Sequence, residues 1–470
     1  MVQRCLLHTT LPALTASFQR RVLSSLRCRP LNAQYKRGRF ATPSCVPIRA
    51  ASAVAEAPST DLGAGLPEII ETSNVPVYLY VRRNELESSA LQQLIALAES
   101  PLPVGYVSAM PDAHLGKGVS IGTVFASERY VAPMAVGVDI GCGMCAVPFN
   151  DLHKDDLKLR DLQKIQRLVK ERIPTGRESH KTPLIGAAHT LEDISQRSAP
   201  SAYVLNSLRE KRALKQLGTL GGGNHFLELV YDETGRVWIM LHSGSRGIGN
   251  STAQHYDRLA ADMLKKQGIK VPSKLHYMEV ESQEGQAYLQ DMQWCQEYAF
   301  QNRHHMLELM VDVVEQVGKS SPDMDKAVNI HHNFCQCERC TYTDPRSGEM
   351  IEKDLYVTRK GATPAAEGQM GLIPGSMGTG SFVTRGRGNA QSWSSCSHGA
   401  GRRMSRTKAK ANISQEEFAK AMQGIVCDTD ERVRDEAPQA YKDLTKVMAN
   451  QASLTEVMHR LRPLVNVKGF

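Results

Sequence analysis

Four separated segments of the chain each carry a side chain that can bind a transition metal or attack a phosphate. They are residues 139–143, 223–226, 241–244 and 331–334, and a fifth segment, 397–403, adds a histidine beside two arginines. Glycine or another small residue lies close by in nearly every case, so backbone can approach a ligand. A thiol, a carboxylate and several imidazoles beside glycine loops indicate metal-assisted phosphoryl or nucleotidyl transfer.

Asp139 and Cys142 belong to one glycine-bounded turn, which can direct both side chains at a single ion. A cysteine after a strand is more often a small core residue, and we expect that role for Cys145. His225 gives a stronger signal, because the glycines at 221–223 offer N–H groups to an anion. Taken alone, a histidine in this position is as often a hydrogen-bonded polar residue as a ligand.

His242 follows an apolar run at 237–241 and precedes a loop of serines and glycines that contains Arg246. A histidine at a strand end beside an arginine suits a metal and a phosphate together. His331 and His332 are adjacent in the chain. Because neighbours on a strand point to opposite faces, we expect only one of these two at a shared site.

Three cysteines follow, Cys335, Cys337 and Cys340, at a spacing that could bind zinc. A structural zinc site usually takes its fourth ligand from a second paired motif, and none is evident. We therefore interpret the segment as a variable insertion and leave an accessory metal as the alternative.

The C-terminal third combines glycine and serine loops at 374–381 with arginines at 397–406. Such loops supply backbone donors, and arginines bind phosphates with two nitrogens at once. A basic solvated loop would explain the arginines but not the glycines. The chain lacks a Gly-x-x-x-x-Gly-Lys-Ser/Thr motif and a Gly-x-Gly-x-x-Gly motif within a βαβ unit, which disfavours P-loop NTPases and Rossmann enzymes.

The net charge of +8 comes from the N-terminal segment. Residues 1–55 hold nine of the 57 Lys and Arg residues and no Asp or Glu, which leaves 48 basic and 49 acidic residues from position 56 onward. An acid-free segment rich in Arg, Ser, Thr and Ala is typical of an organellar transit peptide, and a disordered basic N-terminus is the alternative. We predict a cleaved transit peptide at 1–55, a linker at 56–65 and a chloroplast location, with the mitochondrion as the alternative.

Two further observations concern the compartment. No stretch of about 18 apolar residues occurs, which disfavours a transmembrane helix and a membrane partner. Three of the 11 cysteines lie in the N-terminal segment, and the other eight show no regular disulfide framework. A reduced compartment is the simpler interpretation.

The elements that must position the polar side chains follow one another without regular βαβ spacing. We expect strands at 77–81, 136–138, 226–231, 237–241, 354–357 and 465–467, an apolar run at 106–110, and helices at 86–98, 155–170, 202–216, 285–317, 416–425 and 439–448. A hairpin turn is predicted at 233–235. No repeat or later linker is evident, so we predict one α+β (mixed α/β) domain at 66–470, with a central pocket lined by strand ends and glycine loops.

Taken together and in order, these segments resemble the RtcB family of RNA-splicing ligases over residues 66–470. No single motif is decisive, but the ordered set is specific. Its markers here are Met110-Pro111-Asp112-Ala113-His114, Gly137-Val138-Asp139-Ile140-Gly141-Cys142-Gly143, Gly223-Asn224-His225-Phe226-Leu227-Glu228, Leu241-His242-Ser243-Gly244-Ser245-Arg246-Gly247, His332-Asn333, residues 374–379, His398-Gly399-Ala400-Gly401-Arg402 and Val467-Lys468-Gly469.

The resemblance implies an enzyme that joins an RNA 3′-phosphate or 2′,3′-cyclic phosphate end to a 5′-hydroxyl end, in tRNA splicing or RNA repair. It implies GTP and two manganese ions as cofactors. A histidine takes GMP from GTP and passes it to the RNA 3′-phosphate, and the 5′-hydroxyl then displaces GMP. RNA with such ends, tRNA halves included, is the expected partner, and an archease-type activator is suggested.

The resemblance also assigns roles by position. His398 matches the guanylated nucleophile. The ligands of the two-manganese site are matched by Asp139, Cys142, His225, His242 and His332. Guanine-nucleotide contacts are matched by Asn224, Glu228, Ser376, Ser381, Tyr441 and Lys468. Groups near phosphates or RNA ends are matched by Arg246, Lys360, Arg402 and Arg406.

General chemistry agrees with these roles without fixing the cofactors. A histidine nucleophile must be unprotonated, a state that imidazole reaches near neutral pH. Mixed oxygen, nitrogen and sulfur ligands are compatible with manganese, although their intrinsic affinity for zinc is higher. Manganese and guanine are therefore implied by the resemblance alone.

Two other classes of function stay open at this point. A metal-dependent RNA phosphodiesterase or end-processing hydrolase would use Asp139, His225 and His242 equally well and would need no GTP. A non-catalytic RNA-binding protein would use the arginines at 402–406. It would have no use for Cys142 together with three glycine-flanked histidines.

Overall fold

Two β-sheets organise the part of the chain that the computed structural model describes, residues 65–469 apart from 210–211 and 273. Within that part, one sheet has the strand order β1-β2-β3-β4-β12-β11 and the other the order β10-β6-β8-β7-β17-β15-β14. β2 and β3 are parallel, whereas the neighbours at the centre of the second sheet are antiparallel. Most of the bounds are β1 Glu68–Ile70, β2 Val77–Leu79, β3 Val104–His114, β4 Ile121–Ser127, β6 Gly143–His153, β7 Phe226–Tyr231, β8 Arg236–Ser243, β10 Val328–His331, β11 Asn333–Thr343, β12 Met350–Lys360, β14 Met370–Pro374, β15 Ser381–Gly386 and β17 Thr455–Lys468.

Two short strand pairs lie outside these sheets, β5 (Tyr130–Val131) with β9 (Met278–Glu279) and β13 (Ala362–Pro364) with β16 (Ser395–Ser397). The mixture of helices with largely antiparallel sheets confirms the predicted α+β class. The predicted transit peptide at 1–55, and all of the linker except Gly65, lie outside the described residues.

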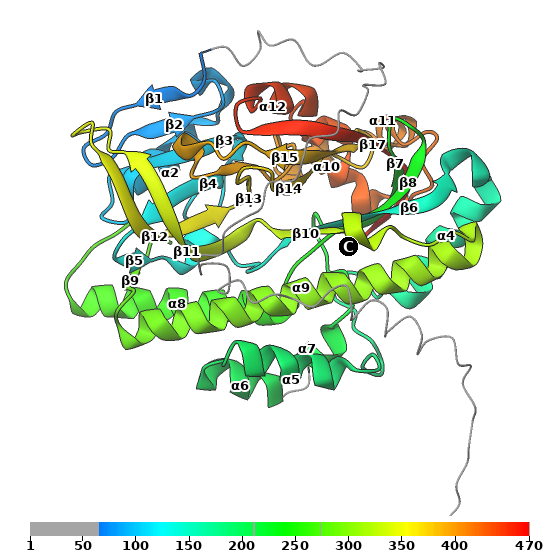
Figure 1. Ribbon diagram of the computed structural model, residues 1–470, viewed down its shortest axis with the longest axis horizontal. Helices are drawn as coiled ribbons and strands as arrows, with labels where there is room; N and C mark the ends of the chain where they lie inside the picture. Colours follow the sequence, from blue (N-terminus) through cyan, green and yellow to red (C-terminus); the bar gives the residue numbers. More distant parts are fainter. Residues whose placement is uncertain (1–64, 210–211, 273, 470) are drawn as a thin grey trace, which may run out of the picture.

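The long helices α8 and α9 run along one side of the sheets, and the group α5–α7 lies beyond α9 (Figure 1). α9 begins after Ser282, whose side chain accepts the Gly285 N–H at 3.0 Å, and ends at Lys319 in a left-handed conformation. The helices are α2 Ser88–Ala98, α3 Pro133–Val136, α4 Leu159–Arg172, α5 Ala187–Arg197, α6 Ala202–Arg209, α7 Arg212–Gln216, α8 Arg246–Lys266, α9 Gln283–Gly318, α10 Arg406–Asn412, α11 Gln415–Ala421 and α12 Leu444–Asn450.

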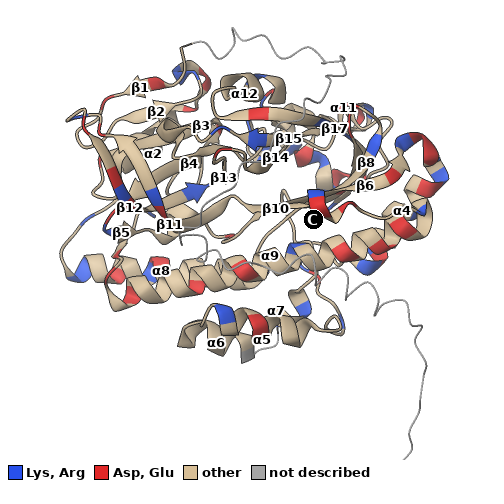
Figure 2. Cartoon of the chain, viewed as in Figure 1, with Lys and Arg blue, Asp and Glu red and all other residues tan. Residues whose placement is uncertain are grey.

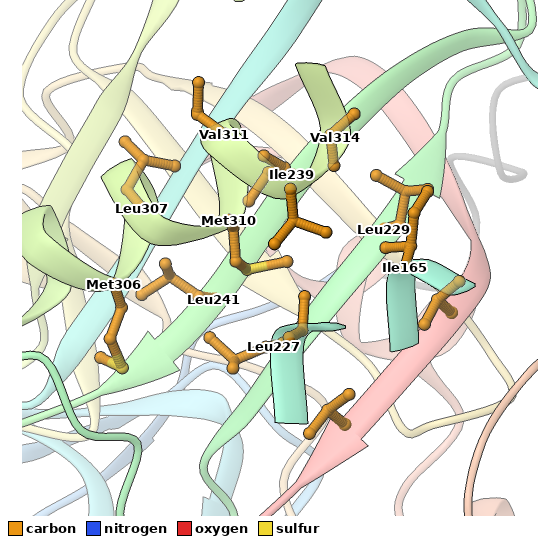
Figure 3. Packing of buried hydrophobic residues seen from close by; sticks show 14 of the residues in the cluster. Ile165, Leu227, Leu229, Ile239, Leu241, Met306, Leu307, Met310, Val311 and Val314 are labelled. Atoms are coloured by element: carbon orange, nitrogen blue, oxygen red, sulfur yellow. The ribbon is translucent and has the colours of Figure 1, made fainter. Parts of the chain in front are cut away.

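The core between α9 and the second sheet decides which way the strand side chains point. Met306, Met310 and neighbouring apolar residues of α9 pack on Leu227 of β7 and on Leu241 of β8 (Figure 3). Burial of each such side chain contributes about 1.5–3 kcal/mol. Since strand residues alternate between faces, the positions next to these leucines face the other side of the sheet. His242 is one of them, so the core packing of α9 directs it away from the helix.

α4 carries charges of both signs, whereas the charged residues of α9 are acidic apart from the buried Arg303 (Figure 2). In the described part of the chain, no helix is both long and apolar enough to span a membrane.

Most predicted elements are present, and two predictions are wrong. Residues 136–138 were expected to form a strand, but α3 ends at Val136 and Gly137 follows with φ of 104°. Pro133 favours the start of a helix, and the run is apolar because it is buried and not because it is a strand. Residues 439–448 were expected to form one helix. The chain instead extends at Tyr441 and starts α12 at Leu444, with Asp443 as the N-cap. The predicted helix at 202–216 corresponds to α6 and α7.

Candidate metal and nucleotide site

Five side chains converge where β6 and β7 begin and where β8 and β10 end. Cys142 Sγ lies 3.4 Å from His225 Nε2 and 3.2 Å from His242 Nε2. His225 Nε2 lies 3.0 Å from Asp139 Oδ2, and His242 Nε2 lies 3.2 Å from His332 Nε2. The thiol and the three imidazoles are buried. The five residues that the sequence assigned to a metal site therefore form one cluster.

Glycines make room for the turn that carries Asp139. Gly141 has φ of 72°, and a Cβ at this position would lie 2.8 Å from Gln296 Cα of α9. A Cβ on Gly244 would lie 2.2 Å from Asp139 Oδ1. The turn can approach both the helix and the end of β8 only with glycine at these two positions.

Backbone carbonyls fix the protonated nitrogen of two of the imidazoles. His225 Nδ1 lies 2.9 Å from the Leu220 carbonyl, and His242 Nδ1 lies 3.3 Å from the Asn224 carbonyl. Because a carbonyl oxygen can only accept, each Nδ1 carries the proton and each Nε2 presents a lone pair. Lone pairs that face a thiol and a carboxylate at about hydrogen-bonding distance are what a bound cation would stabilise.

The cluster divides into two groups that share one residue. Cys142, His242 and His332 form one group, and Asp139, Cys142 and His225 form the other. Within each group the ligand atoms lie within 4.8 Å of one another. Each group could hold a divalent ion, with Cys142 as a residue common to both, and thiolate and imidazole are ligands that transition metals prefer.

Burial dominates the protonation of the cluster. It lowers the pKa of His242 and of His332 well below the ordinary value, so both imidazoles are neutral ligands. Burial also raises the pKa of the Cys142 thiol. For Asp139, burial acts to raise the pKa, but the contacts with His225 outweigh it and the pKa is lowered. A cation at the cluster would favour the thiolate.

Two residues of α9 hold the metal-binding loops in place. The Asn302 side chain accepts the N–H of Gly218 and donates to the carbonyl of Gly244. Arg303 Nη1 donates to the carbonyls of Gly141 and Ser243 at 2.8 and 3.0 Å. Both side chains are fully buried. The loops on either side of the cluster are thus attached to one rigid helix.

His398 lies beside the cluster, with its ring centroid 4.9 Å from that of His332. Its Nδ1 is 2.6 Å from Asp112 Oδ2, although the direction is poor for a hydrogen bond. The same carboxylate oxygen accepts the backbone N–H groups of His398 and Gly399. Asp112 is fully buried, and His398 is the main reason why its pKa is lowered despite burial. This arrangement favours a proton on Nδ1 and leaves Nε2 as the nucleophilic nitrogen.

A cavity of about 770 Å³ extends from His398 and His242 toward the end of β17. We call it the nucleotide cavity. All six residues that the resemblance assigned to nucleotide contacts line it, and so do two of the four that it assigned to phosphates. They are Asn224, Glu228, Ser376, Ser381, Tyr441, Lys468, Arg402 and Arg406. Its size is that of a small-molecule site.

Glu436 is the centre of an ion network at the far end of this cavity. Its carboxylate accepts from Lys468 Nζ at 2.6 Å, from Tyr441 Oη at 2.8 Å and from Arg402 Nη1 at 3.2 Å, and it also contacts Arg406. Burial acts to raise the pKa of Glu436, but Lys468 and the other cations lower it to about 2. The carboxylate is therefore ionised and fully paired without any ligand.

Glu228 lines the same cavity in a different state. Burial raises its pKa to about 7, and the hydrogen bond from Asn466 Nδ2 at 2.6 Å counteracts burial only in part. Asn466 Oδ1 is buried without a partner. Glu228 and Asn466 thus leave hydrogen-bonding capacity free for a ligand.

Comparison with known proteins decides the family. The family model described as tRNA-splicing ligase RtcB matches residues 93–469. The chain belongs to the RtcB family. RNA-splicing ligase RtcB of Escherichia coli (strain K12) is 39% identical over 417 residues, which cover 86% of this chain and 99% of that protein. The tRNA-splicing ligase RtcB of Methanococcus maripaludis is 31% identical over 450 residues, which cover 82% of this chain and 92% of that protein.

Two residues that the sequence assigned to phosphates lie outside the nucleotide cavity of this RtcB-family chain. Arg246 lies behind the metal cluster, where its guanidinium donates to Thr219 Oγ1 and to the Gly176 carbonyl. Lys360 Nζ donates to the carbonyls of Lys117 and Met134 at 2.6 and 2.8 Å. Burial lowers the pKa of Lys360 to about 7.

The three clustered cysteines do not come together. Cys335 packs in the apolar cluster around α8 and α9, Cys340 packs in a different one near Trp393, and Cys337 is exposed. Neither of the metal-capable groups found among the described residues includes them. The segment forms the long β11–β12 hairpin.

Four site residues of this RtcB-family chain were missed by sequence reasoning. Asp112 and His114 lie in β3, in a segment that was named as a marker of the resemblance without a role. Glu436 stands in a charged stretch, 431–436, that is typical of a solvated surface. Asn466 lies within the strand β17. Only the spacing of Asp112 and His114 beside a glycine loop offered a signal.

Proposed function

We propose that this chain is a GTP- and manganese-dependent RNA ligase. It joins an RNA 3′-phosphate or 2′,3′-cyclic phosphate end to a 5′-hydroxyl end through a GMP bonded to His398. The observation that carries the proposal is the position of His398, with Asp112 behind its ring, between the metal cluster and the nucleotide cavity. Membership of the RtcB family supports the RNA-joining reaction.

The residues at the two ends of the nucleotide cavity have different roles in the reaction. His398 Nε2 attacks the α-phosphorus of GTP, the bond to pyrophosphate breaks, and the imidazolium that forms is stabilised by Asp112. Ions held by the five-residue cluster would neutralise charge on the phosphate oxygens. Arg402 and Arg406 line the same cavity, and their guanidiniums could pair with the nucleotide phosphates.

Guanine is the base that the far end of the cavity would accept. The ionised form of Glu228 can take both hydrogens that guanine presents at N1 and at its 2-amino group. Asn466 and Lys468 stand next to Glu228. These contacts support GTP over ATP, since adenine has neither donor in those positions.

Labelling with GTP tests the proposal. The purified chain is incubated with GTP labelled in the α-phosphate and with manganese, and acid-labile GMP is expected on the protein. His398→Ala is expected to remove the label, because no other nitrogen nucleophile occupies this position. His459→Ala is the matched control, because His459 pairs with Glu233 at the surface and does not line the nucleotide cavity.

The same experiment distinguishes the ligase from a rival function. Labelled protein is then supplied with RNA bearing a 3′-phosphate and RNA bearing a 5′-hydroxyl, and a joined product is expected with release of GMP. RNA end cleavage without nucleotide, and without joining, would instead support a metal-dependent hydrolase. Absence of label on wild-type protein would sink the His398 mechanism.

The natural partners are a second part of the proposal. We infer that the RNA is a pair of tRNA halves or a damaged transcript with the same ends, and that an archease-type activator assists turnover. We also infer that residues 1–55 direct the protein to the chloroplast. A fusion of residues 1–65 to a fluorescent protein tests this: fluorescence in mitochondria would correct the organelle, and fluorescence in the cytosol would refute the targeting.

A further inference from the structure

A second cavity, of about 380 Å³, opens beside the nucleotide cavity and shares Glu87, His114 and Arg402 with it. We call it the side cavity. Its volume is sufficient for a small-molecule ligand. The reaction proposed above leaves it unused. It is lined by Val81, Glu85, Glu87, Pro111, Ala113, His114, Arg402, Arg403, Lys442, Asp443, Lys446, Val447 and Asn450.

The lining of the side cavity suits a nucleoside better than a bare phosphate. Val81, Pro111 and Val447 are apolar, and acidic groups accompany the cations. One of these, Glu85, is paired with Lys446 at the rim. A cavity with apolar, donor and acceptor groups matches a base and a ribose, whereas a phosphate alone would require an excess of cations.

Arg403 provides the plane on which a base can stack. It is exposed, and its Nε donates to the Gln439 carbonyl at 2.7 Å. Among the described residues, no partner is found for its two terminal nitrogens. Unstacked RNA bases stack on guanidinium planes, and free guanidinium nitrogens bind phosphates.

His114 stands at the junction of the two cavities as a hydrogen-bond acceptor. Its Nδ1 lies 2.9 Å from the carbonyl of Asp112, so Nδ1 carries the proton and Nε2 presents a lone pair. No partner for Nε2 is found in the described part of the chain. Burial lowers the pKa of His114 to about 4, so the ring stays neutral. A neutral lone pair repels phosphate oxygens and attracts a hydroxyl.

Distances link this acceptor to the reacting histidine. The ring centroids of His114 and His398 are 6.5 Å apart, with the planes inclined by 19°. An RNA phosphate that takes GMP from His398 must come next to that ring. The nucleoside that bears the phosphate must then lie in space contiguous with the nucleotide cavity, and the side cavity meets that condition.

We propose that the side cavity binds the 3′-terminal nucleoside of the RNA strand that receives GMP, and that His114 Nε2 accepts a hydrogen bond from its 2′-hydroxyl. This inference rests on the proposed function. The 5′-hydroxyl strand is excluded from the side cavity by the geometry of phosphoryl transfer. The attacking hydroxyl must approach in line with the leaving group, from the side opposite GMP, whereas the side cavity borders the GMP side.

A double variant, Arg403→Ala with Lys446→Ala, tests which strand is bound. Both residues line the side cavity and neither lines the nucleotide cavity. Self-guanylylation uses no RNA and is expected to stay at the wild-type level, which also reports that the protein is folded. The concentration of 3′-phosphate RNA that half-saturates GMP transfer is expected to rise roughly tenfold, the effect of a lost stacking contact.

Matched measurements make the test decisive. The double variant Lys265→Ala with Lys266→Ala removes two exposed charges at the end of α8, outside both cavities, and should behave as wild type. The dependence on the 5′-hydroxyl strand should be unchanged in both double variants. An unchanged 3′-strand dependence, or a shift confined to the 5′-hydroxyl strand, would overturn the inference. Loss of guanylylation in wild-type protein would instead refute the proposed function.

A substrate change tests His114 separately. Wild-type protein is expected to transfer GMP roughly fivefold better to a ribose end than to an end with one terminal 2′-deoxynucleotide, the value of one hydrogen bond. His114→Ala should bring this ratio close to one. His114→Gln places an amide group near the position of Nε2 and should restore part of it. A ratio that is the same in wild type and His114→Ala would refute the role of His114.

Discussion

The two ends of the nucleotide cavity are built on opposite electrostatic plans. At the metal end, the lone pairs of His225 and His242 face a thiol and a carboxylate. At the nucleotide end, Glu436 is already paired with Lys468, Tyr441 and two arginines. The first end needs a cation to be stable, whereas the second is organised before any ligand arrives. We therefore expect bound metal to change the stability of the metal end, and loss of a single charged side chain to change the stability of the nucleotide end.

Removal of the Glu436 carboxylate should give the largest effect on stability. Glu436→Ala leaves Lys468 as a buried cation without its counterion, which costs about 3–5 kcal/mol of the free energy of unfolding. Urea unfolding followed by circular dichroism measures this change. Glu456→Ala is the control, because its ion pair with Arg385 is exposed and its loss should cost much less. Equal losses in the two variants would mean that the buried ion network stabilises the fold no more than an exposed ion pair does.

Glu228, the second carboxylate that lines the cavity, should make the fold less stable as pH rises. The folded chain holds a proton on Glu228 up to about pH 7, whereas the ordinary pKa is 4.5. The unfolded chain therefore binds fewer protons, and Glu228 destabilises the fold progressively as pH rises from 4.5 to about 7. The difference between wild type and Glu228→Gln should amount to roughly 3 kcal/mol across that range. A difference that does not change with pH would contradict this.

Metal bound at the metal end of the cavity should stabilise the fold by somewhat less than the two effects above. Manganese at 100 times its dissociation constant should raise the free energy of unfolding by about 2.7 kcal/mol, and a chelator should reverse the gain. Cys142→Ala should remove most of the gain, since both metal-capable groups contain this residue. Cys145→Ala, a core position three residues later, should lose stability but keep the metal response. Metal-induced shifts of equal size in both variants would refute the shared ligand.

Base selectivity should give the smallest effect. Inosine lacks the 2-amino group of guanine, so wild-type protein should prefer GTP to ITP in self-guanylylation. A hydrogen bond to an ionised group is worth about 1.5 kcal/mol or more, so the preference should be about tenfold. Glu228→Gln should reduce this preference, while Glu436→Gln should retain it. An unchanged preference in Glu228→Gln would mean that another group reads the base.

The fold was predictable where periodicity and burial agree. The strands β7 and β8, their hairpin and the long helix α9 follow from alternating or helical apolar patterns. The prediction of a strand at 136–138 was wrong, because an apolar run indicates that residues are buried but not which backbone conformation they adopt. There Pro133 and Gly137 determine the backbone.

The site was predictable only in part, for a related reason. Residues that carry unusual chemistry beside glycines, such as Cys142 and His225, stand out in a sequence. Glu436 does not, because a glutamate in a charged stretch looks solvated until its cations, more than 30 positions away at Arg402 and Lys468, are brought to it. Arg303 is likewise hidden within an ordinary amphipathic pattern.

The attachment of the metal loops to the middle of α9 makes the phase of that helix a catalytic property. Each residue in an α-helix turns the side-chain direction by about 100°, so deletion of a single residue between the N-terminus of α9 and Asn302 would swing Asn302 and Arg303 away from the loops they hold. The helix would persist and could still cover the sheet. Enzymatic activity would then be lost through a rotation of part of the helix, although no metal ligand is changed.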